Sequence, residues 1–208
     1  MANSVDLAYP FAGRWQVRNS PANRIPSHGT ALFGLSYAID FIPVDETGRS
    51  AAFTTRSVFR PEPPTAFVGF GRAITAPIAG TVIGIHDASP DHAAYRGFPS
   101  VGYALTQRKR LREGLTSVLG NHVLIEADTH TGVAVIVVLC HLQQASVTVE
   151  HGQQVTIGET LGRCGNSGNS TEPHLHLHAL DGPDLVRSAA VPITFNGQLP
   201  HNKETVIV

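Results

Sequence analysis

The sequence predicts an all-β fold, an antiparallel β-sandwich or open barrel with one helical insertion. Three observations lead to this prediction. Glycine and proline account for 20 and 14 of the 208 residues, while only 15% of the residues are charged, as is typical of a chain with many turns. Short apolar segments recur between turn residues, a pattern typical of closed or sandwiched antiparallel β-domains. Only residues 87–120 depart from this pattern.

The expected strands follow from the alternation of side chains. Over residues 37–42, Asp40 shares one face of a strand with Ala38, while Ile39 and Phe41 lie on the other face. Further strands, each bounded by turn residues, are expected at residues 80–85, 122–127, 133–142 (after a hairpin turn at 128–132), 154–161 and 174–179.

The segment from residue 87 to 120 is interpreted as a loop and helix inserted between two neighbouring strands. Helix-forming residues run from Val101 to Glu113 and include a basic cluster, Arg108 to Arg112. A nucleic-acid patch is the alternative interpretation of this cluster, but it lacks interleaved aromatic residues and the chain is not basic. A solvated helix face is therefore expected.

Composition excludes several classes of function. A net charge of −1 provides no field that would gather nucleic acid or an anionic membrane, so neither is expected as a partner. No apolar run reaches the roughly 18 residues of a membrane-spanning helix. The first residues lack the basic and apolar regions of a secretory signal, so the chain as given is expected in the cytoplasm. Cys140 and Cys164 can form at most one disulfide and are interpreted as small apolar core residues.

The densest group of chemically active residues is a run of three alternating histidines. His174, His176 and His178 lie on one face of the expected strand, with Leu175 and Leu177 on the other. Imidazoles two residues apart on a strand converge on one point, as a metal site requires. The alternative, a solvated or structural histidine strand, is disfavoured by three histidines within five positions.

Two further residues are interpreted as candidate site residues because this histidine group is present. His141 ends the most apolar strand of the chain and by alternation shares its face with Val137 and Leu139. Asp40 lies on an otherwise apolar strand, and burying a carboxylate is costly unless it is paired or binds a metal. Taken alone, a histidine or an aspartate in such a position more often has a structural role than a functional one.

Several motifs follow one another in a specific order. They are Gly80-Thr81-Val82, Gly120 to Ile125, His141-Leu142, Val149 to Gly162, and Gly165 to His176. This ordered set resembles the lysostaphin-type (LytM-like) zinc endopeptidases over roughly Tyr37 to Leu180. The resemblance implies a LytM-like β-fold, with residues 37–180 as its core and residues 1–208 forming a single domain.

The resemblance also implies roles for individual residues. His176, the second histidine of the His-x-His motif, would ligate one zinc ion. Asp40 would be the carboxylate ligand. His174 and His141 would flank the metal as catalytic histidines.

One position departs from the family pattern. The first motif is usually His-x-x-x-Asp, but the residue four positions before Asp40 is Ser36, a poor zinc ligand. His28 is the only histidine upstream of Asp40, and it is expected to replace the missing ligand from a loop that folds back. At position 178 the family often has an acidic residue, where this chain has His178.

This ligand set is consistent with catalysis. Two imidazoles and a carboxylate leave the fourth position of zinc open for water, whose pKa falls to about 7 when it is bound. No glutamate base is evident, so proton transfer is expected from a histidine. His141 and His174 would divide proton acceptance and oxyanion stabilisation, in an order that the sequence leaves open. The substrates implied by the family are peptidoglycan cross-links or Gly-rich peptides.

Two alternatives of other classes remain. Ser36 keeps open a catalytically impaired module that binds or regulates cell-wall hydrolases. A phosphocarrier domain of the glucose phosphotransfer type also has two facing histidines, but it requires neither Asp40 nor a His-x-His pair. The location expected from the chain's first residues conflicts with the family, whose members usually act in the cell envelope or are secreted.

Overall fold

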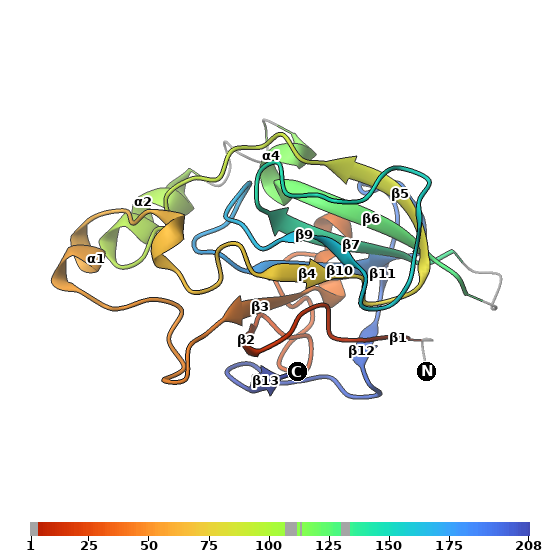
Figure 1. The fold of residues 1–208 in the computed structure, drawn as a ribbon, viewed down its shortest axis with the longest axis horizontal. Helices are drawn as coiled ribbons and strands as arrows, with labels where there is room; N and C mark the ends of the chain where they lie inside the picture. Colours follow the sequence, from red (N-terminus) through yellow and green to blue (C-terminus); the bar gives the residue numbers. More distant parts are fainter. Residues whose placement is uncertain (1–3, 107–111, 113, 130–133) are drawn as a thin grey trace.

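The computed structural model describes residues 4–106, 112, 114–129 and 134–208, and most of its regular structure is β. The predicted all-β antiparallel class is confirmed. In the described residues, one large sheet has nine strands, all paired antiparallel (Figure 1). In spatial order these are β13 (Thr205–Ile207), β2 (Arg14–Arg18), β3 (Ile39–Pro43), β10 (Leu175–Leu180), β7 (Ile136–Leu142), β6 (Asn121–Ala127), β5 (Gly80–His86) and β8 (Gln154–Val155), with β11 (Ala190–Val191) paired to β10.

Two short strand pairs accompany this sheet. The strand β1 (Val5–Leu7) runs parallel to β12 (Ile193–Phe195), and β4 (Ala73–Thr75) runs antiparallel to β9 (Thr160–Arg163). These pairs join segments far apart in sequence, so local alternation does not reveal them.

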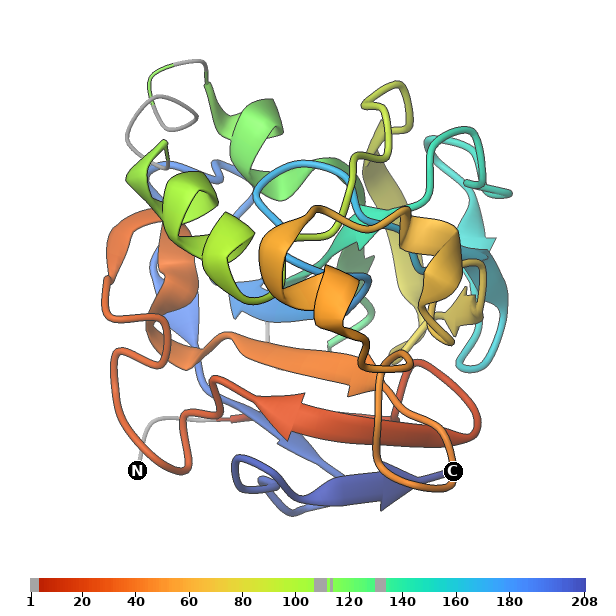
Figure 2. The ribbon, with the colours of Figure 1, turned by 90° about the vertical axis from the view of Figure 1, so that its left-hand side faces the viewer.

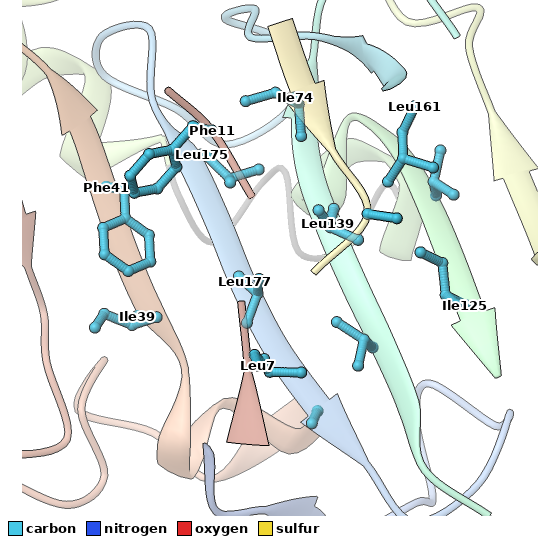
Figure 3. Close-up of a cluster of buried hydrophobic side chains, with 14 of the residues drawn as sticks. Leu7, Phe11, Ile39, Phe41, Ile74, Ile125, Leu139, Leu161, Leu175 and Leu177 are labelled. Atoms are coloured by element: carbon cyan, nitrogen blue, oxygen red, sulfur yellow. The ribbon is translucent and has the colours of Figure 1, made fainter. Parts of the chain in front are cut away.

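One face of the large sheet is packed with apolar side chains. Ile39 and Phe41 of β3 lie beside Leu175 and Leu177 of β10, and Leu139 of β7 continues the layer (Figure 3). All five are fully buried, and burying one such side chain contributes about 1.5–3 kcal/mol. Because strands alternate, their neighbours in sequence point to the opposite face. That opposite face carries Asp40 and His176.

The helical part of the insertion differs from the prediction in its bounds. The helix α2 spans Phe98–Leu105, so it begins three residues before the expected start at Val101. Proline fits the first turn of a helix, and Pro99 lies in that turn. Residues 107–111 and 113 lie outside the described residues, and α4 (Leu115–Leu119) follows them.

Three shorter helical segments precede the insertion. They are η1 (Leu32–Tyr37), α1 (Thr55–Phe59) and η2 (Pro64–Ala66). The helices α1 and α2 lie side by side at one end of the molecule (Figures 1 and 2), where the rings of Phe59 and Phe98 stack with centroids 5.7 Å apart.

Most of the expected strands are present, but the one at residues 154–161 is divided. The structure has β8 and β9 with a turn between them. Gly158 in this turn has φ +85°, a conformation that favours glycine, and the Glu159 carboxylate accepts a hydrogen bond from the Thr156 amide. The expected turn at 128–132 lies partly outside the described residues. Within the described part of the chain, no helix is long and apolar enough to cross a membrane.

Candidate metal centre

Three residues from separate segments meet on the non-core face of the large sheet. His28 Nε2 lies 3.1 Å from Asp40 Oδ2, and His176 Nδ1 lies 2.9 Å from Asp40 Oδ1. One donor atom from each residue can be chosen so that all three lie within 4.8 Å of one another. Zinc takes imidazole and carboxylate ligands at about 2.0–2.2 Å, so a donor set of this kind at this separation fits one ion.

Strand pairing accounts for two of these positions. His176 of β10 is directly opposite Asp40 of β3 in the antiparallel register, and side chains of opposite residues project to the same face. Both residues are 6% exposed. The sheet therefore brings together residues that are 136 positions apart in the sequence.

His28 reaches the site from a loop that folds back onto η1. The Ser27 amide donates to the Ser36 carbonyl (3.0 Å), and the Ser27 hydroxyl donates to the Leu35 carbonyl (3.1 Å). The same hydroxyl lies 3.0 Å from His28 Nδ1. This leaves Nε2 of His28 facing Asp40. The structure thus places His28 where the resemblance lacks a ligand.

The electrostatics favour an ionised carboxylate between histidines. Burial would raise the pKa of Asp40, but the charge of His28 and the hydrogen bonds of His176 and His28 hold this pKa well below its ordinary value. Burial lowers the pKa of His176, an effect that Asp40 opposes. Burial also lowers the pKa of His28, but the nearby Asp40 outweighs it and raises this pKa overall.

His141 and His174 lie beside these donors, with ring centroids 4.7 Å apart. His141 Nδ1 is 2.9 Å from the Ser167 carbonyl, and His174 Nδ1 is 2.8 Å from the Glu172 carbonyl. A carbonyl oxygen only accepts hydrogen bonds, so Nδ1 carries the hydrogen in both rings. In the neutral rings Nε2 is therefore free to accept a proton. His174 Nε2 lies 3.8 Å from Asp40 Oδ1.

The backbone at His141 corrects the face assigned to it from alternation. Simple alternation places this side chain in the core with Val137 and Leu139. In the structure His141 has φ +63°, a left-handed conformation that costs a non-glycine residue about 1–3 kcal/mol. This conformation turns the ring out of the core, to a centroid distance of 5.8 Å from His176. Burial, followed by His174 and His176, lowers the pKa of His141 well below its ordinary value.

All five predicted site residues border one cavity of about 520 Å³. Its lining is formed by Asn19, His28, Gly29, Thr30, Leu32, Phe33, Leu35, Asp40, Tyr103, Val118, Leu119, His141, Asn169, Thr171, His174 and His176. The insertion contributes part of this wall, through Tyr103 of α2 and two residues of α4. The roles assigned to the five residues stay predictions.

Asn19 is a site residue that no pattern in the sequence predicts. Its side-chain amide donates to Asp40 Oδ2 at 2.7 Å, and its backbone has φ +47°. Asparagine adopts this conformation more readily than most residues and is common in turns. The signal available in the sequence was therefore a turn at Asn19, with no indication that the turn lies beside Asp40.

His178 occupies the position where the family often has an acid. Its Nδ1 lies 3.1 Å from His176 Nε2, so it contacts the ring nitrogen that faces away from Asp40. Burial lowers the pKa of His178 well below its ordinary value. His178 therefore orients His176 and is not one of the three donors. The free cysteines Cys140 and Cys164 are buried, as expected for apolar core residues.

Comparison with known proteins gives one family match. The model of peptidase family M23 matches residues 102–186, a segment that includes His141, His174 and His176 and begins after His28 and Asp40. No curated protein matches the sequence. The resemblance to LytM-like peptidases is confirmed by this match.

Several solved structures are similar to this one. A putative peptidase M23 from Pseudomonas aeruginosa has 21% identity and a TM-score of 0.44, over 92% of this chain and 50% of that one. This chain thus spans half the length of that protein. The catalytic domain of the antimicrobial peptidase lysostaphin from Staphylococcus simulans has 13% identity and a TM-score of 0.41, over 91% and 95% of the two chains. LytU has 18% identity and a TM-score of 0.41, over 90% and 82%.

Proposed function

The chain resembles the LytM-like peptidases of family M23, and on this premise we propose that it is a zinc-dependent endopeptidase. Its proposed substrates are peptide bonds in peptidoglycan cross-links or in Gly-rich peptides. One observation supports this proposal most strongly. His28, Asp40 and His176 form a compact donor set, while His141 and His174 border the same cavity.

His28 Nε2, an oxygen of Asp40 and His176 Nδ1 would hold the metal. When bound, zinc acts as a Lewis acid on the scissile carbonyl and lowers the pKa of water at its open position. Asp40 is already oriented for this task, because Asn19, His28 and His176 fix its two oxygens. Such supporting hydrogen bonds orient the ligands of a metal site.

His141 and His174 would move the protons of the reaction. Because backbone carbonyls hold their Nδ1 hydrogens, each neutral ring has Nε2 available to accept a proton. One ring accepts the proton of the attacking water at Nε2, and the other, when protonated, donates a hydrogen bond to the developing oxyanion. A positioned acid or base of this kind typically contributes 10²- to 10⁴-fold in rate.

The regulatory-module alternative is weakened by His28. The regulatory module was an alternative because Ser36 occupies the position of a usual metal ligand. His28 provides an imidazole beside Asp40 from another segment. A binding module has no need for a complete donor set next to two histidines with available Nε2 atoms.

Hydrolysis with controlled metal content tests the proposal. Purified protein is treated with a chelator and dialysed, and cleavage of pentaglycine and of purified peptidoglycan is followed by release of new amino groups. We expect activity to be lost on chelation and restored by about one equivalent of zinc. If the zinc-loaded protein cleaves neither pentaglycine nor peptidoglycan, the result favours the regulatory module.

A further inference from the structure

The sheet face that holds the metal donors continues past them onto the neighbouring strand. On β3, Asp40 and Ile42 project to the same face. Across the ladder, Arg18 of β2 is opposite Asp40 and Gln16 is opposite Ile42. Their neighbours on β2 belong to the apolar core on the other face. Arg18 and Gln16 therefore extend the surface on which the donor set lies.

A second pocket of about 410 Å³ opens on this extension. It is lined by Gln16, Arg18, Ile42, Val44, Gly48, Arg49, Ser50, Ala51, Phe53, Arg96 and Glu172. Strand residues rise about 3.4 Å each, so Ile42 and Val44 lie about 7–14 Å along the chain direction from Asp40. An extended peptide crossing the metal centre would cover this distance in two to four residues.

Two of the charged residues in this pocket are already engaged. Arg96 donates from Nε and Nη2 to the two carboxylate oxygens of Glu62, both at 2.7 Å. The Glu172 carboxylate accepts a hydrogen bond from the Ser50 hydroxyl at 2.6 Å. Arg96 also lies close enough to Glu172 for the two charges to interact.

With Arg96 paired to Glu62, the Arg18 and Arg49 guanidinium groups outnumber the Glu172 carboxylate in the pocket lining by one charge. Among the residues that the structure describes, neither the Arg18 nor the Arg49 guanidinium has a hydrogen-bond or ion-pair partner. Asp45 interacts electrostatically with Arg49. Its Oδ1 is occupied by the amides of Thr47 and Arg49. Two exposed guanidinium groups thus border a pocket that continues the face of the metal centre.

We propose that this second pocket is a substrate subsite for a peptide carboxylate, two to four residues from the scissile bond. The guanidinium fork of arginine matches a carboxylate in two parallel hydrogen bonds. Arg18 and Arg49 are the residues that recognise it, and Arg96 stays paired with Glu62. This inference deepens the proposed function and rests on it for the location of the scissile bond.

Matched peptides test the subsite. A Gly-rich peptide is made in a series in which one position at a time, on either side of the expected cleavage point, is Glu or Gln. A further pair ends in a free carboxylate or an amide and distinguishes a chain end from a side chain. Cleavage is measured as kcat and KM for the zinc-loaded wild-type protein, for Arg18→Gln/Arg49→Gln, and for the control Arg187→Gln. Arg187 is a highly exposed arginine that does not line the pocket.

We expect a preference of at least about tenfold in kcat/KM for the carboxylate peptide at one position, the scale of a charge-assisted hydrogen bond. The preference should appear mainly in KM and disappear in Arg18→Gln/Arg49→Gln, with cleavage of the Gln peptide unchanged. Arg187→Gln should retain it. A carboxylate preference at no position, or one that persists in the double variant, overturns the proposal.

A binding experiment separates this inference from the proposed function. The same peptides, now with a fluorescent label, are titrated with His141→Ala and with the triple variant His141→Ala/Arg18→Gln/Arg49→Gln, and anisotropy is recorded. The zinc-loaded wild type can fail to cleave every peptide while the carboxylate still tightens binding through Arg18 and Arg49. In that case the peptidase proposal fails and the carboxylate-binding pocket stands. Equal binding of Glu and Gln peptides overturns the subsite whether or not cleavage occurs.

Discussion

At the scale of single residues, His28 would ligate the metal in place of the family's usual histidine. Its ring is held on one side by Ser27 and faces Asp40 on the other. We predict that His28→Ala lowers zinc affinity by more than about 100-fold, since even loss of a residue that supports a ligand costs 10–100-fold. Competition with a chromogenic chelator measures this affinity. Ser36→Ala is the matched control and should bind zinc as the wild type does, because the structure uses the Ser36 backbone carbonyl.

The second residue-scale prediction separates ligands from catalytic groups. His141→Ala and His174→Ala should each retain zinc and lose about 10²- to 10⁴-fold in kcat, since both hold Nδ1 on backbone carbonyls. His176→Ala should lose zinc itself, because it removes a donor beside Asp40. Metal analysis and initial rates on the same preparations check both statements. Loss of zinc in His174→Ala to the extent seen in His176→Ala would contradict the assigned roles.

At the scale of elements, the loop that carries His28 depends on two glycines in different ways. Gly34 has φ +70°, and a Cβ there would lie 2.0 Å from Cδ2 of the buried Leu180. Gly29 has φ +74° with no atom within 4 Å of a built Cβ. We predict that Gly29→Ala lowers the free energy of unfolding by about 1 kcal/mol, from backbone strain alone.

Gly34→Ala should cost more, about 2–4 kcal/mol, because a buried steric clash adds to a similar strain. Urea denaturation of both variants, followed by fluorescence of Trp15, compares the two costs. Equal destabilisation would show that the packing of this segment against Leu180 does not contribute.

The strands that the sequence reveals are those with local alternation. Residues 37–42 and 174–179 show their core and site faces in the printed sequence, so Asp40 and His176 were predicted on the site face. Alternation alone places His141 on the face of Val137 and Leu139, because it contains no information about a left-handed residue at a strand end. Asn19 contacts Asp40, which is 21 positions away, and β1 pairs with β12 across most of the chain. A local pattern contains neither contact.

At the scale of the whole molecule, metal binding should couple to stability. The three donors come from the loop at His28, from β3 and from β10, so one ion would link three segments. A ligand that binds only the folded state stabilises it by about 2.7 kcal/mol at 100 times its Kd. We predict that chelation lowers the Tm of the wild type by several degrees and leaves the Tm of His176→Ala unchanged, as followed by circular dichroism.

Zinc stoichiometry shows directly whether His28 is a metal ligand. Wild type, His28→Ala and Ser36→Ala are dialysed together against buffer containing a low micromolar concentration of zinc, and bound metal is counted by mass spectrometry. We expect about one zinc per chain for the wild type and Ser36→Ala, and almost none for His28→Ala. Wild-type protein without zinc, or His28→Ala that retains a full equivalent, would contradict this expectation.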